Sequence, residues 1–402
     1  METKCIFNLD GTYKEFETEL TSVLNESGKL LPGDNIVIGS CSLGKSIGSN
    51  VRSLSNVSRG LSVVNITDDP ISISTNDFFS EYRTLEQIYE RLTNLYSTCN
   101  TNDNCSMKVL EPKTINDNNL LLFKVGNGNN NILITGGMHA REWMSVMATS
   151  YLVERMIQLE RNGEWNDVFS ENTFYIIPIS NPDGYAHTYQ NINNRFWRKN
   201  MNGVDLNRNW NVGFENNTNM DSDTYGGAEP FTENEVVAIK NVFDSNSFKL
   251  HFDIHAFSQM VAASWSYTDE LHPRNDEFMK YGDIIVKSMK NNNYIYGHGS
   301  VQNLLGLAGG TIQDYTSNNN TLGFTIELPP RDGGINAFSI DSNNIIPVGD
   351  DLINMLFNVS ENNYTVEDRN NQTSKRNMNY LGFFSLFLFA ILLIYIILKR
   401  PF

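Results

Sequence analysis

Short hydrophobic runs alternate with amphipathic segments over most of the chain from residue 78 onward. The segment 85–95 places Leu85, Ile88, Leu92 and Leu95 on one face of a predicted helix. Further helices are predicted at 142–159, 233–243, 276–289 and 347–357, and buried strands at 120–126, 131–137, 173–180, 248–255 and 322–329. Alternation of this kind predicts an α/β fold with a mixed, mostly parallel, doubly wound sheet and helices on both faces.

The main domain is predicted to span residues 75–360, and a more weakly patterned segment precedes it. Residues 1–74 contain strand-like stretches at 4–9, 35–40 and 61–66 and a helical stretch at 13–24. They are predicted to form an N-terminal extension or an atypical prodomain. The first residues show neither a basic region nor an apolar run, so no signal peptide is predicted.

The other end of the chain carries the longest apolar run. Residues 361–379 are polar and are predicted to form a stalk. Tyr380 to Leu398 is a run of nineteen residues without a charge, and as a helix it would be about 28 Å long, close to the hydrocarbon thickness of a bilayer. This run predicts a single transmembrane helix. Because basic residues stand on both sides of it, the charge pattern does not predict its orientation.

Composition excludes some classes of protein. Of the 402 residues, 40% are hydrophobic and 11% aromatic, enough for a sizeable core, which excludes disorder throughout. The net charge of −16 excludes a nucleic-acid backbone as the expected partner. Four cysteines are too few for a disulfide scaffold. Cys99 and Cys105 form either a small disulfide loop or two unpaired thiols. The oligomeric state is not predicted.

Side chains able to bind a metal or move a proton stand at the ends of three predicted strands. His139 and Glu142 follow the strand 131–137, His255 ends the strand 248–255, and Glu327 lies in the strand 322–329. Sites in doubly wound sheets collect beyond the carboxyl ends of the strands. Two histidines and one carboxylate with a fourth position open are a known ligand set for catalytic zinc. A single H-x-x-E pair is a weak signal, so the prediction depends on the neighbouring motifs.

Those motifs occur in unbroken order between the first and last of these strands: NPDGY (181–185), NRFWRKN (194–200), DLNRNW (205–210), IHAFSQ (254–259) and GFTIELP (323–329). Together with the segment HAREW that begins at His139, they make the sequence resemble the M14 zinc carboxypeptidases of the pancreatic carboxypeptidase A/B type. The resemblance covers about residues 78–360. It implies a metallocarboxypeptidase that releases C-terminal amino acids from peptides or proteins.

The resemblance also implies roles at the reacting centre. His139, Glu142 and His255 match the ligands of one Zn²⁺ per chain. Glu327 matches the general base that activates water. Arg198 matches the arginine that stabilises the oxyanion of the tetrahedral intermediate.

Four further residues match positions around that centre. Asn207 and Arg208 match the pair that binds the terminal carboxylate of the substrate, for which a bidentate arginine is suited. Arg141 matches an auxiliary substrate-binding arginine. Asp205 matches the carboxylate that orients the first histidine ligand. The other four histidines match no functional position and are interpreted as structural or exposed: His187, His251, His272 and His298.

The sequence departs from the family pattern at two positions. The family's mobile tyrosine is replaced by leucine, at Leu305 or Leu304 depending on the direction of counting. The residue that selects the substrate side chain is Ile312 when counted from Gly310, and Gln313 when counted back from Asp314. Neither is acidic, so a Lys or Arg preference is not expected. With Ile312 at this position, an apolar C-terminal residue is the expected substrate.

Two other functions and two locations remain open. A small-molecule deacylase of related fold would share the metal ligands but lack the Asn207–Arg208 pair, and a non-enzymatic binding protein would be expected to lose a ligand or the base. The resemblance favours a single-pass membrane protein with its catalytic domain extracellular or lumenal. The alternative, suggested by the absence of a visible signal peptide, is a tail-anchored enzyme on the cytosolic face.

Overall fold

The computed structural model describes residues 74–97, 104–289 and 306–361 in full. It also describes the backbone of five strands: Lys4–Asn8, Lys29–Leu30, Ile36–Ser40, Val63–Ile66 and Gly297–Ser300. The chain divides into two compact units, residues 1–355 and residues 356–402. Of the second unit, the structure describes only the last residues of a helix that ends at Glu361.

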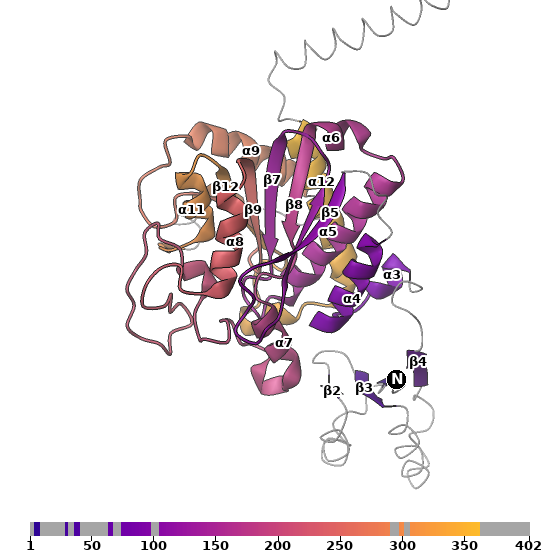
Figure 1. The fold of residues 1–402 in the computed structure, drawn as a ribbon. Coiled ribbons are helices and arrows are strands. Elements are labelled where there is room, and N and C mark those ends of the chain that lie inside the picture. The colour runs from indigo at the N-terminus through magenta and orange to yellow at the C-terminus, as the bar shows by residue number, and fades with distance from the viewer. Residues whose placement is uncertain are drawn as a thin grey trace, which may run out of the picture. The chain divides into compact units, whose positions relative to one another are not determined.

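The first unit is built around an eight-stranded mixed sheet (Figure 1) with the strand order β11-β10-β12-β9-β7-β8-β6-β5. The strands are β5 (Cys105–Leu110), β6 (Leu120–Val125), β7 (Asn130–Gly136), β8 (Asn172–Ile177), β9 (Phe248–Ala256), β10 (Met260–Ala263), β11 (Gly297–Ser300) and β12 (Leu322–Leu328). The four central strands, β12, β9, β7 and β8, run parallel, whereas β5, β6 and β10 pair with their inner neighbours antiparallel. The predicted mixed, mostly parallel sheet is therefore confirmed.

Helices cover both faces of this sheet, as predicted. They are α3 (Thr75–Phe78), α4 (Leu85–Tyr96), α5 (Trp143–Arg161), α6 (Asn166–Glu171), α7 (Pro182–Gln190), α8 (Asn234–Asp244), α9 (Asn275–Ser288), α11 (Ile312–Asn318) and α12 (Ile345–Glu361), with short 3₁₀ turns at Ile192–Asn194, Leu206–Arg208, Gly334–Ser339 and Ser342–Asn344. Figure 1 shows α8 in front of the sheet and α5 behind it. The α12 helix packs on α5, where Tyr151 donates a hydrogen bond of 2.8 Å to Asp350.

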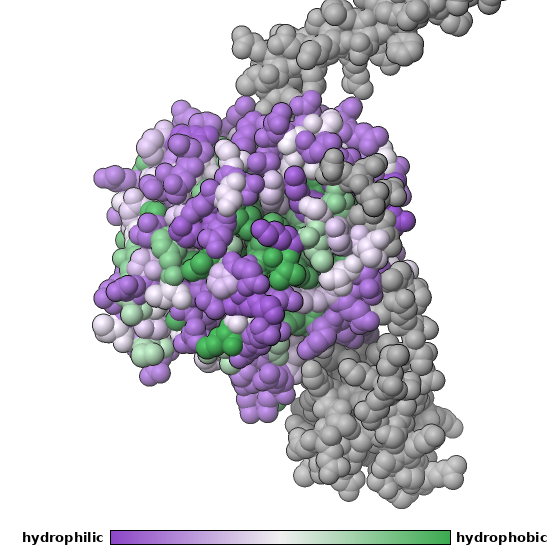
Figure 2. Space-filling view, in the orientation of Figure 1, coloured by the Kyte–Doolittle hydropathy of each residue, from purple (hydrophilic) through white to green (hydrophobic). Residues whose placement is uncertain are grey.

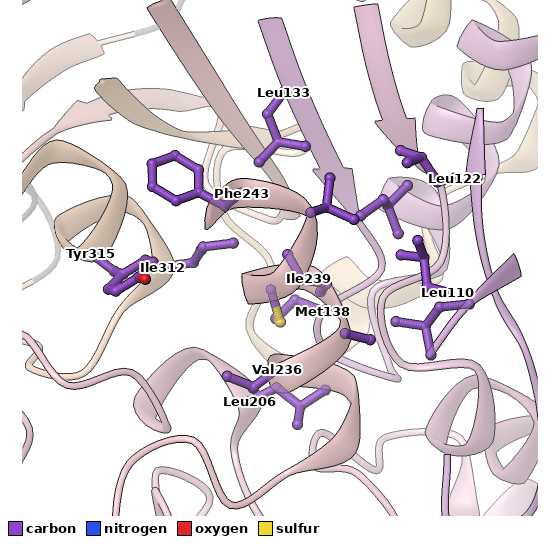
Figure 3. Packing of buried hydrophobic residues seen from close by; sticks show 14 of the residues in the cluster. Leu110, Leu122, Leu133, Met138, Leu206, Val236, Ile239, Phe243, Ile312 and Tyr315 are labelled. Carbon is purple, nitrogen blue, oxygen red and sulfur yellow. The ribbon is translucent and has the colours of Figure 1, made fainter. Parts of the chain in front are cut away.

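Hydrophobic residues fill the space between the sheet and α8 (Figure 3). The positions Val236, Ile239 and Phe243 recur at intervals of three and four, so they share one helical face, and that face packs towards Leu133 of β7. Ile312, at the start of α11, belongs to the same cluster and is completely buried. Each fully buried aliphatic or aromatic side chain contributes roughly 1.5–3 kcal/mol, so this layer holds the helix against the strands.

The opposite face combines aromatic packing with a buried ion pair. Phe252 of β9 and Phe324 of β12 stack at 5.9 Å between ring centroids, and Phe278 of α9 packs on Phe324. Between α4 and α5, the guanidinium of Arg91 donates two hydrogen bonds, of 2.8 and 2.7 Å, to the buried carboxylate of Glu154. A bidentate pair satisfies both partners, so α4 is fixed to the central helix behind the sheet.

The surface that carries α8 is mostly hydrophilic, with hydrophobic side chains gathered near its centre (Figure 2). A groove of about 470 Å³ on this side of the sheet is lined by residues of β5, β6 and α8, among them Val109, Leu122 and Val242. None of the candidate site residues lines this groove. The chemistry predicted from the strand ends therefore lies elsewhere in the first unit.

The N-terminal residues contain a separate four-stranded antiparallel sheet with the order β2-β3-β1-β4. Its strands are β1 (Lys4–Asn8), β2 (Lys29–Leu30), β3 (Ile36–Ser40) and β4 (Val63–Ile66). Three of them coincide with the strand-like stretches predicted from sequence. The helical stretch predicted at 13–24 lies outside the described residues, and whether the segment acts as a prodomain stays a prediction.

The predicted stalk, apart from Glu361, and the predicted transmembrane helix at 380–398 also lie outside the described residues. In the part of the chain that the structure describes, no helix is both long and apolar enough to cross a bilayer. Cys105, at the start of β5, is disulfide-bonded, so it is not one of the unpaired thiols considered above. Cys99 lies outside the described residues, and its pairing with Cys105 stays a prediction.

Candidate metal centre and active site

The turn between β7 and α5 brings His139 and Glu142 together. Gly137 adopts a φ of +63°, and a Cβ there would lie 2.7 Å from Val146 of α5, so this sharp turn requires glycine. Glu142 occupies the N-cap position of α5 but makes no capping hydrogen bond. Its carboxylate instead lies 2.7 Å from Nδ1 of His139. The turn thus directs two potential metal ligands to one point.

The third member of the cluster comes from β9, which is hydrogen-bonded to β7. Nδ1 of His255 lies 2.9 Å from the carboxylate of Glu142 and 3.1 Å from Nδ1 of His139. The ligand atoms of the three buried residues all lie within 4.8 Å of one another. The structure therefore brings together the three residues predicted as zinc ligands.

Each histidine is held by a carboxylate on the side away from the cluster. Nε2 of His139 lies 3.1 Å from Asp205, and Nε2 of His255 lies 2.6 Å from Asp253. Both carboxylates are completely buried. Partners of this kind fix the ring orientation and leave the other nitrogen facing the metal. Two such histidines and one carboxylate fit the coordination chemistry of catalytic zinc.

The charged groups of the cluster are buried, so their pKa values depend on burial and on the charges of their neighbours. Burial raises the pKa of the Glu142 carboxyl, but the two neighbouring histidines outweigh this effect and lower that pKa well below its ordinary value. For His255, burial lowers the pKa, while Asp253 and Glu142 raise it further than burial lowers it. A divalent cation bound by the cluster would take the place of the histidine protons as the positive partner of the Glu142 carboxylate.

Glu327 lies directly across from His255, because β12 pairs with β9 in parallel register. Its Oε2 atom is buried and has no hydrogen-bond partner among the described residues. Burial and the negative charge of Glu142 raise the pKa of Glu327 to about 8, against the opposing effect of His255 and Arg198. A carboxyl group that retains its proton at higher pH than usual is suited to exchanging protons with a reacting molecule.

Two of the predicted site arginines, Arg198 and Arg141, pair with different carboxylates. Arg198 donates hydrogen bonds of 3.0 and 2.8 Å to Asp205, and its Nη1 is 4.0 Å from Glu142. Arg141 pairs with the exposed Asp223 at 2.9 Å. Arg198 thus lies against the metal ligands, whereas Arg141 is engaged by a surface carboxylate.

The Asn207–Arg208 pair sits in the 3₁₀ turn that follows Asp205. The amide nitrogen of Asn207 contacts Asp253 and His255 at 3.3 and 3.2 Å, and its oxygen accepts a hydrogen bond of 2.9 Å from the backbone of Ile312. Arg208 makes a hydrogen bond of 2.7 Å to the carbonyl of Asn207. In this conformation, therefore, Asn207 supports the His255 side of the cluster, whereas Arg208 contacts the backbone of the same turn.

The structure places the two candidates for the selectivity residue differently. Ile312 is completely buried in the hydrophobic cluster beneath α8. Gln313 instead accepts a hydrogen bond from the hydroxyl of Thr325 on β12. The side chain of Ile312 packs against the core and both residues are almost completely buried, so the role of Ile312 in selecting the substrate side chain stays a prediction. The leucines at the mobile tyrosine position, Leu304 and Leu305, lie outside the described residues.

Sequence reasoning did not identify Asp253, although a signal for it was present. The run HFDIH places His251, Asp253 and His255 at alternate positions of one strand, so all three share a face. An acidic residue two positions before a strand-end ligand is a candidate partner for it. His251 itself is structural, as predicted from sequence: it is buried between Thr135 and Thr316.

The known proteins that this chain resembles are zinc carboxypeptidases, which agrees with the metal site described above. The model of the Peptidase_M14 family, described as zinc carboxypeptidase, matches residues 80–355. Zinc carboxypeptidase A 1 of Anopheles gambiae is 28% identical over 301 residues, covering 70% of this chain and 68% of that protein. Human carboxypeptidase A5 is 30% identical over 309 residues, covering 72% and 69%.

Solved structures agree at the level of the fold. The structure of bovine thrombin-activatable fibrinolysis inhibitor in complex with tick carboxypeptidase inhibitor aligns with a TM-score of 0.65 and 25% identity, covering 71% of this chain and 98% of that one. Carboxypeptidase A from Helicoverpa armigera aligns with a TM-score of 0.62 and 18% identity, covering 90% and 98%. The second likeness concerns the fold alone.

Proposed function

This chain belongs to the M14 family of zinc carboxypeptidases, and from that premise we propose that Glu327 is the general base with which it releases amino acids from the C-termini of peptides or proteins. The chain is a metallocarboxypeptidase, and its cofactor is zinc. The observation that carries the assignment of Glu327 is its position directly across from His255, with a buried oxygen that no described residue engages.

The residues around the cluster can each take a separate role in peptide hydrolysis. His139, Glu142 and His255 would hold the zinc ion, which when bound supplies a Lewis acid that activates water and polarises the peptide carbonyl. Glu327 takes a proton from the attacking water and delivers it to the nitrogen of the departing amino acid. Arg198, beside the ligands, donates hydrogen bonds to the oxyanion that forms on the former carbonyl.

Selection for the end of a chain requires a partner for the terminal carboxylate. Arg208 is suited to this role because its guanidinium can donate two parallel hydrogen bonds to a planar anion. Its backbone is close to the turn that begins α11, since a Cβ at Gly310 would lie 2.3 Å from the carbonyl oxygen of Arg208. The arginine is therefore attached to a rigid part of the domain, which favours recognition of a carboxylate at a fixed distance from Glu327.

Replacing Arg208 by glutamine tests the exopeptidase assignment. Hydrogen bonds to charged groups contribute about 1.5–3 kcal/mol, so kcat/KM for a peptide with a free C-terminus should fall about 10- to 100-fold. The wild-type enzyme should discriminate strongly against the same peptide with a C-terminal amide, and Arg208→Gln should lose most of that discrimination. The measurement is hydrolysis of the paired acid and amide substrates by both proteins.

Arg274 provides the matched control for this substitution. It is a partly exposed arginine that immediately precedes α9 and pairs with Glu277 of that helix, and a surface pair of this type contributes little. Arg274→Gln should therefore hydrolyse the two substrates like the wild type. If Arg208→Gln retains full discrimination between acid and amide, Arg208 does not bind the terminal carboxylate.

The alternatives left open by the sequence are now set aside. The domain belongs to a family whose relatives are named carboxypeptidases, so a small-molecule deacylase and a non-enzymatic binding protein are not proposed. The preference for an apolar C-terminal residue, which was expected from Ile312, stays a prediction.

We also propose that the catalytic domain works outside the cytosol, on a membrane anchor formed by residues 380–398. The disulfide at Cys105 supports an oxidising compartment, and the nineteen-residue uncharged run supports the anchor. In sealed microsomes the domain should be protected from added protease until detergent is present. Digestion without detergent would place the domain on the cytosolic face, as in the tail-anchored alternative.

A further inference from the structure

Arg195 is a buried arginine in the segment that also carries Arg198. Its side chain is 1% exposed, and burial lowers the pKa of its guanidinium to about 10, so it is still charged at neutral pH. It donates one hydrogen bond of 2.8 Å to the carbonyl of Arg141 and another to the carbonyl of Phe338. The guanidinium lies over the ring of Trp143, 3.8 Å from its centroid, where the ring attracts a cation. These contacts hold the charge in one place.

The contacts of Arg195 fall on both sides of the metal ligand Glu142. Arg141 precedes this ligand and Trp143 follows it, and Arg195 binds the carbonyl of the first and the ring of the second. Glu142 is the N-cap residue of α5, with a ψ of 64°. A capping side chain would normally fix this backbone, but the carboxylate of Glu142 faces the histidines instead. Arg195 therefore supplies a restraint that the turn itself lacks.

The segment that carries Arg195 is attached to the turn a second time. The backbone nitrogen of Ala140 donates a hydrogen bond of 2.9 Å to the carbonyl of Arg198. The guanidinium of Arg198 pairs with Asp205 and lies 4.0 Å from Glu142. The side chain of Arg195 and the backbone of Arg198 thus both fix this segment on the turn, so one metal ligand and the arginine beside it are held in one arrangement.

The ring beneath Arg195 is itself held in place. Trp143 is 1% exposed, its indole nitrogen donates a hydrogen bond of 2.8 Å to Thr188, and its ring stacks on Tyr189 at 3.9 Å between centroids. A guanidinium donates from several nitrogens in a fixed plane, whereas an ammonium group is a single point. Two carbonyls and a flat ring in fixed positions therefore suit an arginine, and a lysine would keep the charge without matching them.

We propose that Arg195 is a positioning residue that holds the ligand Glu142 in the orientation that binds zinc and holds Arg198 beside it. The part concerning Arg198 rests on the proposed function, whereas the part concerning Glu142 is measured by zinc binding alone. Groups that orient a metal ligand contribute about 10- to 100-fold to metal affinity. Arg195→Gln should weaken zinc binding by this factor, measured by competition between the holoenzyme and a chelator, and Arg195→Lys should lie between it and the wild type.

Kinetics at saturating zinc test the effect on Arg198. For a peptide with a free C-terminus, kcat of Arg195→Gln should fall about tenfold, because a displaced group that acts on the transition state lowers turnover. KM should stay within about twofold of the wild-type value, since Arg208 is untouched. Arg195→Lys should recover part of the lost kcat. A role in stability alone would not produce this division between kcat and KM.

Arg91 provides the matched control. It is also a buried arginine, paired with Glu154, which is about 18 Å along α5 from Glu142. Arg91→Gln should lower the melting temperature, because it leaves a buried carboxylate without its partner, but zinc affinity and kcat should stay at the wild-type values.

Three results would overturn the inference and leave Arg195 as a residue that only stabilises the fold. They are unchanged zinc affinity in both Arg195 variants, an equal loss of zinc affinity in Arg91→Gln, and failure of both Arg195 variants to fold. A wild-type protein that binds zinc but hydrolyses no peptide would instead overturn the proposed function, and the comparison of zinc affinities would still decide whether Arg195 positions Glu142.

Discussion

Glu327→Gln is expected to keep its zinc and to lose at least about 100-fold in turnover, the contribution typical of general-base catalysis. Glutamine has nearly the same shape as glutamate, so the packing around β12 is retained, but its carboxamide cannot accept the proton from water. The ligands are untouched by this substitution. Zinc analysis and kinetics on the same preparation therefore separate loss of chemistry from loss of metal.

Glu235 supplies a matched control for this substitution. It is a buried glutamate of α8, and like Glu327 it has one carboxylate oxygen without a partner among the described residues. Burial raises its pKa to about 7. Glu235→Gln should keep wild-type turnover, because this residue lies outside the site. Turnover of Glu327→Gln within threefold of the wild type at full zinc content would show that another group is the base.

The central sheet could be predicted from the sequence because its strands are buried on both faces. Such strands read as continuous apolar runs, and each one predicted between residues 120 and 329 coincides with an observed strand. The short outer strands β5 and β10 were not predicted. The burial of β5 is irregular, with only its last residue fully buried, and β10 has four residues. Neither strand has a hydrophobic pattern long enough to predict a strand from the sequence.

The metal ligands could be predicted because the neighbouring motifs match the family pattern, and local geometry explains much of their arrangement. His139 and Glu142 belong to one turn, which the glycine at 137 makes sharp, and a strand-end histidine on β9 needs only the parallel pairing of β7 and β9 to join them. The contacts that Asn207 makes could not be predicted from the sequence in this way. Its contacts with Asp253 and Ile312 connect residues far apart in the sequence, and no spacing rule indicates them.

The selectivity residue shows a limit of counting along a sequence. Ile312 and Gln313 are neighbours at the start of α11, and successive residues of an α-helix point about 100° apart. An uncertainty of one position therefore exchanges a residue packed in the core for one directed towards β12. Counting from the two ends of the motif gave both residues, and their side chains make different contacts, with the hydrophobic cluster for Ile312 and with Thr325 for Gln313.

Loss of a zinc ligand should have the largest effect of all. In His255→Ala the cluster keeps only His139 and Glu142, and a catalytic zinc site needs three protein ligands. We expect the zinc content to fall from one ion per chain to a trace and hydrolysis to become undetectable. Removal of the metal from the wild type with a chelator should have the same effect, but added zinc should restore only the wild type.

Two further variants on β9 show whether this loss is specific. Asp253→Asn leaves the ligand in place but weakens the hydrogen bond that orients it, so zinc affinity should fall about 10- to 100-fold. His251→Asn replaces a buried histidine on the same face of the same strand, whose contacts are with Thr135 and Thr316, and should keep its zinc. A graded series of zinc affinities, with His251→Asn above Asp253→Asn and His255→Ala lowest, is the expected result. Equal loss in all three variants would mean that β9 requires these side chains for folding, and His255 would then need independent evidence as a ligand.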